Sequence, residues 1–435
     1  MGRRASAGAA FTGGAALLLG ACGGSSPTTG PSSASSATTS TSSTSTAGST
    51  AVTTAAPVRD ASVDLVIWCD QDQKPILDTY ATQFGQANGI TVAVQVSTDV
   101  RRDFQAASSA GTGPDVIVGA HDWLGELVQN GAVKPVNLSP GDQAGFAPQA
   151  IAAARLGGRL YGVPYAIESL ALVRNTALVP EAPSSYEDMV AKGTPLKDSG
   201  RATNVVLQDV GEAASAYPYL RAFGGGIFAR KENGDYDPTK VLVNSAGSIK
   251  GAERLAALGK SGVLSSDVDS TTADAIFDAG TAPYYITGPW AIDKAKKSGV
   301  KYAVSPLPTI GGGQMEPLLE VQMFYVSARA RNDAFAEDFL TSYVTRKELQ
   351  VALFGAGHRS PALTEAYNEV SATDADVRAW FDAGRTALPT PNIPAMSSVW
   401  GPLGRATADV IDQKDPAKER FDAAQAEIVA DMAKG

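Results

Sequence analysis

Residues 64–118 alternate short apolar runs with stretches of helical periodicity, and this alternation constrains the fold more than any other feature of the chain. Three runs have the apolar or alternating pattern of strands. The two stretches between them place apolar side chains three and four residues apart, which predicts helices. In order, these five elements are expected over residues 64–68, 75–88, 90–96, 103–110 and 115–118. Strict alternation of strand and helix predicts an α/β fold built on a layered sheet.

The same alternation continues toward the end of the chain. Strands are expected over residues 205–207 and 284–286, and helices over residues 248–258, 334–343 and 409–433. If the globular part begins near Val58, it holds about 380 residues, which is more than one hydrophobic core normally serves. We therefore expect two α/β lobes.

The first 21 residues have the zones of a secretory signal peptide. Arg3 and Arg4 supply a positive start, residues 9–19 are mainly apolar, and small residues precede Cys22. The apolar run is too short to cross a bilayer as a helix. Residues 19–22 (LGAC) resemble the lipobox of bacterial lipoproteins, in which the peptide is cut before the Cys and the Cys is acylated. The resemblance implies export, with lipidation at Cys22; the general secretory and twin-arginine routes both stay open.

Residues 22–57 differ sharply in composition from the rest of the chain. Ser and Thr dominate residues 25–54, with a few Ala, Gly and Pro. Such a tract has too little apolar surface to offset the entropy of ordering it. We expect the lipidated Cys to be followed by a disordered tether. Glycosylation of the tether is left open by the sequence.

The chain has a net charge of −9 and becomes two charges more negative once Arg3 and Arg4 are removed. An acidic body of this kind has no electrostatic attraction to nucleic acid or to an anionic membrane. Attachment to the outer face of the cytoplasmic membrane is therefore expected through the lipid alone. With Cys22 acylated, Cys69 has no partner, and its place after an apolar run predicts a small buried side chain.

The sequence offers no recognisable catalytic, cofactor or metal-binding set. Its two histidines, His121 and His358, lack metal-ligand spacing, and no nucleophile elbow or phosphate loop is present. His121 is expected to fix a loop by hydrogen bonds. Carboxylates remain as candidates: glycosidases need two of them across a sugar, whereas binding proteins use them to accept hydrogen bonds from hydroxyl groups. Spacing alone does not separate these uses.

Polar and aromatic residues follow several predicted strand ends. Asp70 and Asp72 follow the first strand, Asp122 and Trp123 follow the third, and Trp290 follows the strand at 284–286. Ligands of open α/β sheets sit outside the carboxyl ends of the strands. These residues are therefore expected to line a ligand-binding cleft.

Two of the five tryptophans are presented from turns. Trp290 and Trp400 follow stretches that contain Gly or Pro, where an indole ring suits the apolar face of a sugar better than it fills a core. Trp68 and Trp380 are assigned to packing.

Several stretches together resemble the maltose/maltodextrin-binding proteins, a group of extracellular solute-binding proteins that serve ABC importers. The resemblance runs from about Asp64 to the C-terminus and rests on the order and spacing of the stretches. They are residues 65–68 (LVIW), 113–115 (GPD), 120–122 (AHD), 161–168 (YGVPYAIE), 236–237 (YD), 243–247 (VNSAG), 288–290 (GPW), 307–309 (LPT) and 391–394 (PNIP), with Trp400.

This resemblance implies a two-lobed periplasmic-binding-protein fold with a hinged central cleft. The N-lobe would hold residues 58–166 and 306–343, and the C-lobe residues 167–305 and 344–435. Acidic residues would accept hydrogen bonds from sugar hydroxyls, and aromatic rings would stack on the sugar. The residues implied to contact the ligand are Asp70, Asp72, Gln73, Asp122, Trp123, Glu168, Tyr217 (or Tyr219), Trp290 and Trp400.

Four positions depart from the pattern of the resembled proteins. Gln73 stands where they have Lys, and Gly401 where they have an aromatic residue. Gly119 stands where they have Trp, and Trp123 where they have Arg. A tryptophan has in effect moved from position 119 to position 123, which keeps a stacking surface and loses a guanidinium group. The identity of the sugar therefore stays open.

The resemblance implies capture of maltose and malto-oligosaccharides by hinge closure and delivery to the permease subunits of an ABC importer. The protein would act as a monomer, without a cofactor and not as an enzyme. Two alternatives stay open: a binding protein for another disaccharide such as trehalose, and a secreted glycoside hydrolase that uses two of the carboxylates.

Overall fold

The computed structural model of the protein describes residues 56–232 and 235–434. The predicted signal peptide, Cys22 and nearly all of the predicted tether lie outside these residues. In the described ranges, no helix is both long and apolar enough to cross a membrane. Nor do any three His, Cys, Asp or Glu side chains of these ranges gather so that they could hold a metal ion.

The first sheet contains, in the described part of the chain, the strands β1 (Leu65–Cys69), β2 (Val92–Val96), β3 (Val116–Ala120), β4 (Val133–Lys134), β7 (Gly162–Ser169), β16 (Leu318–Ser327), β17 (Ser360–Pro361) and β18 (Leu388–Pro389). Their order is β17-β7-β16-β3-β1-β2, with β4 and β18 beside β16. β1 runs parallel to β2 and β3, whereas β16 runs antiparallel to β3 and β7.

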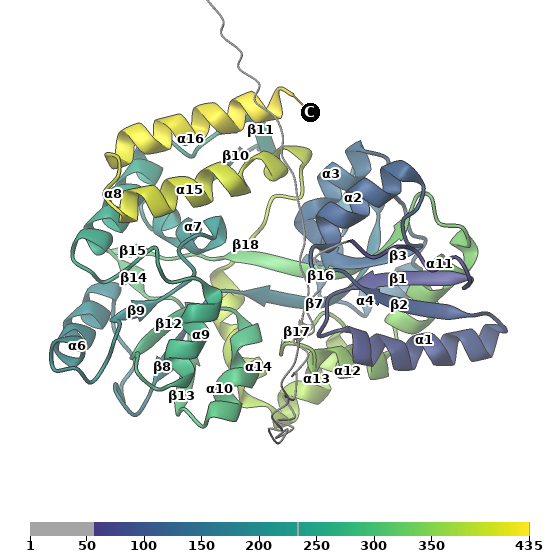
Figure 1. The fold of residues 1–435 in the computed structure, drawn as a ribbon, viewed down its shortest axis with the longest axis horizontal. Helices are drawn as coiled ribbons and strands as arrows, with labels where there is room; N and C mark the ends of the chain where they lie inside the picture. Colours follow the sequence, from purple (N-terminus) through teal and green to yellow (C-terminus); the bar gives the residue numbers. More distant parts are fainter. Residues whose placement is uncertain (1–55, 233–234, 435) are drawn as a thin grey trace, which may run out of the picture. The chain divides into compact units, whose positions relative to one another are not determined.

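The elements predicted over residues 64–118 are confirmed. The three strands are β1, β2 and β3, and the two helices are α1 (Lys74–Asn88) and α2 (Val100–Ala110). α2 begins earlier than predicted because the Asp99 side chain caps it by accepting a hydrogen bond from the Arg102 N–H. α1 ends at Asn88 and is capped by Gly89, whose φ of 66° favours glycine. Figure 1 shows α1 on one side of these strands and α2 and α3 (Leu124–Gln129) on the other.

The second sheet contains β8 (Ala171–Asn175), β9 (Val206–Leu207), β12 (Tyr284–Thr287) and β13 (Tyr302–Ser305), in the order β13-β8-β12-β9. β9 and β12 confirm the strands predicted over 205–207 and 284–286. Three small hairpins accompany the sheets: β5 (Arg155–Leu156) with β6 (Arg159–Leu160), β10 (Phe228–Arg230) with β11 (Tyr236–Val241), and β14 (Thr309–Ile310) with β15 (Gly313–Gln314).

Helices cover both sheets, and most of the predicted ones are present. The helix predicted over 409–433 is divided in two, because Pro416 cannot donate a backbone hydrogen bond. The remaining helices are η1 (His121–Trp123), α4 (Pro140–Ala144), α5 (Pro148–Ala153), α6 (Tyr186–Asp198), α7 (Ala213–Ala222), α8 (Ala246–Lys260), α9 (Ser270–Asp278), η2 (Pro289–Ala291), α10 (Ile292–Ser298), α11 (Asp333–Phe339), η3 (Leu340–Val344), α12 (Lys347–Phe354), α13 (Thr364–Thr373), α14 (Ala375–Ala383), η4 (Gly384–Thr386), η5 (Pro394–Ser398), α15 (Trp400–Ile411) and α16 (Ala417–Met432).

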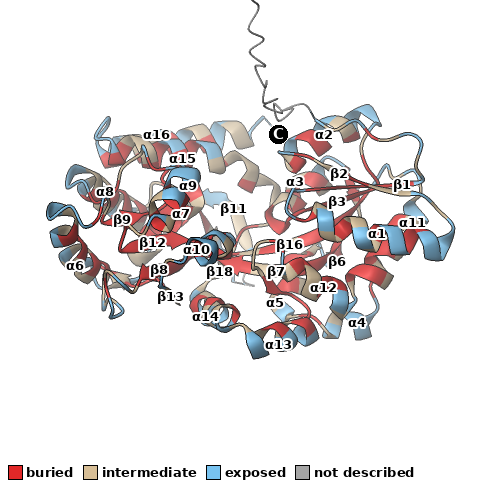
Figure 2. Ribbon diagram, turned by 60° about the horizontal axis from the view of Figure 1, so that its bottom comes forward, coloured by how far each residue is buried: buried red, intermediate tan, exposed pale blue. Residues whose placement is uncertain are grey.

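β7 and β16 connect the two sheets. β7 continues through Leu170 into β8 of the second sheet, and β16 brings the chain back after β13. The two strands pair antiparallel, with Glu168 of β7 opposite Glu320 of β16. One hydrophobic core surrounds the first sheet and others surround the second, and Figure 2 shows the buried residues along both. The predicted two-lobed α/β fold is confirmed.

The exact division of the chain between the lobes stays a prediction. One segment packs differently from that division: Leu349 and Leu353 of α12 are buried in the core of the first sheet, although residues after 343 were assigned to the C-lobe. The reason is that α12 follows η3 directly and packs on β7. Trp68 and Cys69 are fully buried, as predicted, and Trp380 is buried beside the second sheet.

Asp115 joins three segments of the first lobe. Its carboxylate accepts a hydrogen bond from Arg59 Nη1 at 2.5 Å, from the Val66 N–H at 2.8 Å and from the Arg331 N–H at 2.6 Å. The Arg59 and Asp115 side chains are both buried. A buried carboxylate is tolerated here because charged and backbone donors occupy its lone pairs.

Replacing Asp115 by Asn should lower the free energy of unfolding by about 3–5 kcal/mol, because it leaves the buried Arg59 guanidinium without a counter-charge. Urea unfolding followed by circular dichroism measures this change. Asp198→Asn removes an exposed carboxylate of α6 and is the matched control, with an expected change under about 0.5 kcal/mol. Equally small changes in the two variants would contradict the role of Asp115.

Candidate functional site

The loop after β1 carries three of the predicted site residues. Asp70 and Asp72 are exposed, whereas Gln73 is only 3% exposed. Gln73 Nε2 donates to the Tyr165 hydroxyl at 2.7 Å, and Gln73 Oε1 accepts from the Asp70 N–H at 3.1 Å. The amide of Gln73 therefore holds the loop that presents Asp70, and it is turned inward.

Asp70 and Glu168 of β7 both interact with the guanidinium group of Arg359. Arg359 Nε donates to Glu168 Oε2 at 2.6 Å, and Gln322 Nε2 donates to Glu168 Oε1 at 2.8 Å. Although Asp70 is exposed, the surrounding protein displaces enough water to raise its pKa; Arg359 opposes this shift, and Asp72 and Glu168 add to it. One guanidinium group thus faces carboxylates from two segments.

Asp122 lies buried at the end of β3 and is bonded to the second lobe. Trp400 Nε1 donates to Asp122 Oδ2 at 3.0 Å, and Arg101 Nη1 lies 3.9 Å from the same oxygen. Trp400 begins α15 and packs against the core of the second sheet. Burial and the neighbouring Glu320 raise the pKa of Asp122 to about 7, whereas Arg101, His121 and Trp400 oppose the shift.

Both ring nitrogens of His121 are used by the backbone. The Val321 N–H donates to Nδ1 at 3.1 Å, and Nε2 lies 3.1 Å from the Thr390 carbonyl oxygen. Because Nδ1 accepts, the hydrogen-bond pattern assigns the proton to Nε2. Burial lowers the pKa of His121, which favours the neutral ring. His121 fixes the loop after β3, as predicted.

The ring of Trp123 lies over Gly119. A Cβ built at position 119 would come within 1.9 Å of Cζ3 of that ring. Only glycine therefore leaves room for the indole, which packs against the first core and stays partly exposed. The departures from the resembled proteins at positions 119 and 123 are therefore coupled, because the absence of a side chain at Gly119 makes room for the ring of Trp123.

Trp290 is placed over a glycine in the same way. A Cβ at Gly288 would lie 2.0 Å from its ring, which is 39% exposed and has the Arg359 guanidinium 5.9 Å from its centre. The ring lines a cavity of about 220 Å³. An aromatic wall with a polar rim suits a sugar. The polar residues of this rim are Asp209, Glu212, Ser215, Ser270 and Thr287.

Tyr217 and Tyr219 lie inside α7 and are turned into the second core. Tyr217 is 4% exposed, and the hydroxyl of the fully buried Tyr219 donates to Gln208 Oε1 at 2.7 Å. Neither ring presents a free face in this structure, because α7 packs against α8 and α15. The further aromatic surface expected here is instead a packed core contact.

The sequence did not predict Glu320 or Arg359 as site residues, although both lie beside Glu168. Glu320 left a signal, since it is an acidic residue in the largely apolar run of residues 318–327. Arg359 left none, because its contact with Glu168 spans 191 positions of the chain.

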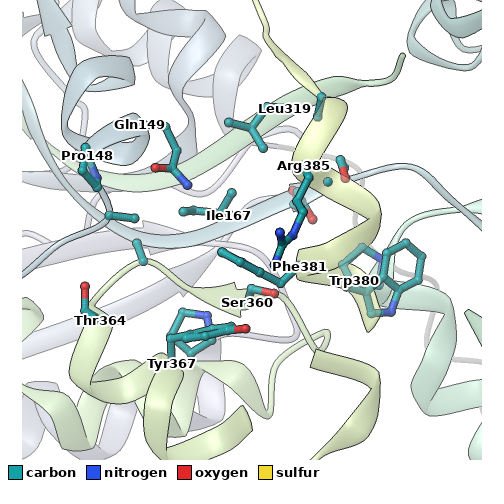
Figure 3. A pocket seen from close by; sticks show the side chains of 18 of the residues that line it. Pro148, Gln149, Ile167, Leu319, Ser360, Thr364, Tyr367, Trp380, Phe381 and Arg385 are labelled. Carbon is teal, nitrogen blue, oxygen red and sulfur yellow. The ribbon is translucent and has the colours of Figure 1, made fainter. Parts of the chain in front are cut away.

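A cavity of about 560 Å³ lies against the crossing strands, where Figure 3 shows Ile167 and Leu319 together with Tyr367, Trp380 and Phe381. Strand alternation turns the side chains of Ile167 and Leu319 away from the face that carries Glu168 and Glu320. Of the predicted ligand-binding residues, all of which are described, Glu168 alone lines this cavity.

The sequence profile of the bacterial extracellular solute-binding proteins matches residues 79–379, so the chain belongs to this family. The galactooligosaccharide-binding protein of Bacillus subtilis (strain 168) is 25% identical over 382 residues, which cover 86% of this chain and 89% of that protein. The maltotriose-binding protein of Pyrococcus abyssi is 26% identical over 365 residues, 81% of this chain and 78% of that protein. A maltooligosaccharide ABC transporter solute-binding lipoprotein of Streptococcus pneumoniae (strain ATCC BAA-255 / R6) is 24% identical over 365 residues, 82% and 85% of the two chains.

Family membership confirms the resemblance to extracellular solute-binding proteins. It also confirms the prediction of a binding protein over that of an enzyme, because the family binds solutes. The alternative of a glycoside hydrolase is therefore set aside.

Gly119→Ala should lower the free energy of unfolding by about 1–3 kcal/mol, because the added methyl group collides with the Trp123 ring. The same substitution in a Trp123→Ala background should cost much less. Urea unfolding of the four proteins gives the coupling energy between the two positions.

Gly141→Ala is the control for this cycle, since the nearest atom to a Cβ there is 3.7 Å away and the residue is exposed. A cost of Gly119→Ala that is the same with and without Trp123 would show that the ring does not lie over Gly119.

Proposed function

We propose that this protein is the sugar-binding component of an ABC importer, and that it captures maltose and malto-oligosaccharides. The observation that carries the proposal is the combination of three indole rings, Trp123, Trp290 and Trp400, with carboxylates on and beside the two crossing strands. Indole rings offer flat apolar surfaces to the C–H faces of a sugar. Carboxylates accept charge-assisted hydrogen bonds from the hydroxyl groups at its rim.

The proposed contacts divide between the two lobes. Asp70, Asp72, Asp122 and Trp123 would contribute from the loops after β1 and β3. Glu168 would contribute from the crossing strand, and Trp290 and Trp400 from the second lobe. Gln73 would act through the Asp70 loop that it holds, and Tyr217 would have no contact while α7 keeps its packing.

Closure of the two lobes would follow from this division. A ligand that touches groups on both lobes binds the closed conformation more tightly, and it shifts the population by that difference in affinity. The bond from Trp400 to Asp122 already joins the lobes at one point. The closed form would then be the one that a permease recognises.

The names of the relatives support a sugar ligand and include two classes of oligosaccharide. Those from Pyrococcus and Streptococcus are named for maltotriose and maltooligosaccharide, whereas the one from Bacillus is named for galactooligosaccharide. The exchange at Gly119 and Trp123 alters the surface beside Asp122. We retain malto-oligosaccharides as the first candidate, and galactooligosaccharides or another disaccharide such as trehalose as the second.

We further propose that the protein is exported and held at the outer face of the cytoplasmic membrane by a lipid on Cys22. The relative from Streptococcus is named as a lipoprotein. The Ser/Thr-rich segment after Cys22 would then give the binding lobes reach toward the permease.

We propose that the protein works as a monomer.

Titration calorimetry with maltose, maltotriose, maltotetraose, trehalose and a galactooligosaccharide tests the ligand. We expect a dissociation constant below about 1 mM for at least one malto-oligosaccharide, which corresponds to about −4 kcal/mol or better. Binding of the galactooligosaccharide alone would replace the first candidate with the second. The absence of heat with every sugar would refute the proposed function.

Trp290→Ala should weaken binding of the sugar identified in this way by about 1–3 kcal/mol, because it removes a stacking surface. Val429→Ala is the control, since Val429 of α16 is an apolar side chain that is 50% exposed and lines neither of the two cavities. Calorimetry on both variants measures the change. An unchanged affinity in Trp290→Ala, or an equal loss in the control, would contradict the assigned role of Trp290.

A further inference from the structure

Three carboxyl groups stand in one row across neighbouring segments: Asp122 after β3, Glu320 on β16 and Glu168 on β7. Glu168 and Glu320 are directly paired in the antiparallel register. Gln322 pairs with Ala120, the last residue of β3, on the other side of β16. Asp122 follows in η1, which packs against β16, and its side chain is hydrogen-bonded to Glu320. Paired positions share a face of the sheet, and like charges at such positions destabilise it.

The cations near this row lie at its two ends. Arg359 bonds to Glu168, with Asp70 close by, at one end. At the other end Arg101 lies 3.9 Å from Asp122 Oδ2, while its own closest partner is Glu126 at 2.6 Å. In the described ranges no Lys or Arg forms an ion pair with Glu320, which occupies the middle of the row.

His121 does not supply the missing positive charge. Glu320 Oε1 lies 3.2 Å from His121 Nδ1, but that nitrogen accepts a hydrogen bond from the Val321 N–H and therefore carries no proton. Glu320 Oε1 is buried without a hydrogen-bond partner, whereas Oε2 accepts from Thr390 Oγ1 at 3.3 Å. The carboxyl group of Glu320 is also hydrogen-bonded to the backbone N–H and to the side chain of Asp122. An ionised Glu320 would thus direct an unpaired oxygen at the lone pair of an imidazole ring.

We propose that Glu320 is protonated in the native protein and shares its proton with Asp122, so that the two side chains form one acid–carboxylate unit that positions Asp122 for the ligand. The unit carries a single negative charge. Its proton lies between the two carboxyl groups, which relieves the repulsion in the row and leaves Asp122 free to accept a hydrogen bond from a hydroxyl group. Glu320 is a positioning residue in this arrangement.

The charges around the pair agree with this arrangement. Burial, with Glu168 close by, raises the pKa of Glu320 to about 8, although hydrogen bonds from Asp122 and Thr390 oppose the shift. Burial, with Glu320 close by, raises the pKa of Asp122 to about 7, against the opposing effects of Arg101, His121 and Trp400. Both shifts favour a shared proton near neutral pH, and the two groups titrate as a pair.

The presence of the proton is tested without any ligand. Protein labelled with ¹³C at the side-chain carboxyl carbon of Glu is titrated by NMR, for the wild type and for Glu320→Gln. We expect one carboxyl signal that is still protonated at about pH 6, well above the usual pKa of Glu, and that is missing in the variant. Complete ionisation of every Glu carboxyl group by about pH 6 would overturn the proposal.

The effect on binding is tested by the pH profile of sugar affinity, and this part rests on the proposed function. Loss of the shared proton places a second negative charge in the row, so the wild-type affinity should fall by up to about tenfold per pH unit above the pKa of the pair. Glu320→Gln keeps the shape of the protonated acid and cannot ionise. Its affinity should therefore change much less between about pH 6 and about pH 9.

Glu316→Gln is the control, because Glu316 is a partly buried carboxylate with its own partner, Arg221, at 2.6 Å. It should keep the wild-type pH profile. The same profile in the wild type and Glu320→Gln would overturn the positioning role. If no sugar binds at any pH while the NMR signal is present, the proposed function fails and the shared proton stands.

Discussion

The antiparallel pairing of β7 with β16 is the interaction on which the rest of this structure depends. These strands leave one sheet and continue toward the other, so their hydrogen bonds belong to the connection between the lobes as much as to the first sheet. The paired positions place Glu168 opposite Glu320 on one face, while Leu319 and Ile167 are turned to the other. One face of this pair therefore carries the carboxylates and the other is apolar, and Glu168 lies at the border between the candidate ligand site and the larger cavity against the strands.

The first lobe's strands and helices were predictable because local signals are strong there. Short apolar runs, amphipathic spacing and Gly89 each act over a few residues, and the structure keeps nearly the same elements. The fold class followed from their alternation. The path of the chain between the lobes was harder to predict. Whether α12 packs on β7 or on the second sheet depends on contacts between distant segments, which periodicity does not describe.

The candidate site shows the same limit at the level of single side chains. Asp70, Asp122 and Trp290 were predictable because they follow strand ends, where open α/β sheets place ligands. Gln73 and Tyr217 share those neighbourhoods but are turned inward, by a bond to Tyr165 and by the packing of α7. Glu320 was not predicted as a site residue because the role of an acidic residue in a strand depends on the side chains that lie beside it. Its neighbours on β7 and after β3 are known only once the register is known.

Gly119 and Trp123 also have a consequence for how such a site changes over generations. Since a Cβ at position 119 would lie 1.9 Å from the indole, any larger residue there destabilises the protein while Trp123 keeps this position. A lineage that changes from this arrangement to one with tryptophan at 119 and arginine at 123 avoids that loss of stability if it replaces the residue at 123 before it enlarges the one at 119. In the opposite direction, position 119 must become glycine before the tryptophan at 123 can take this place. The effects of substitutions at the two positions therefore depend on their order, and this order influences which binding surfaces can evolve.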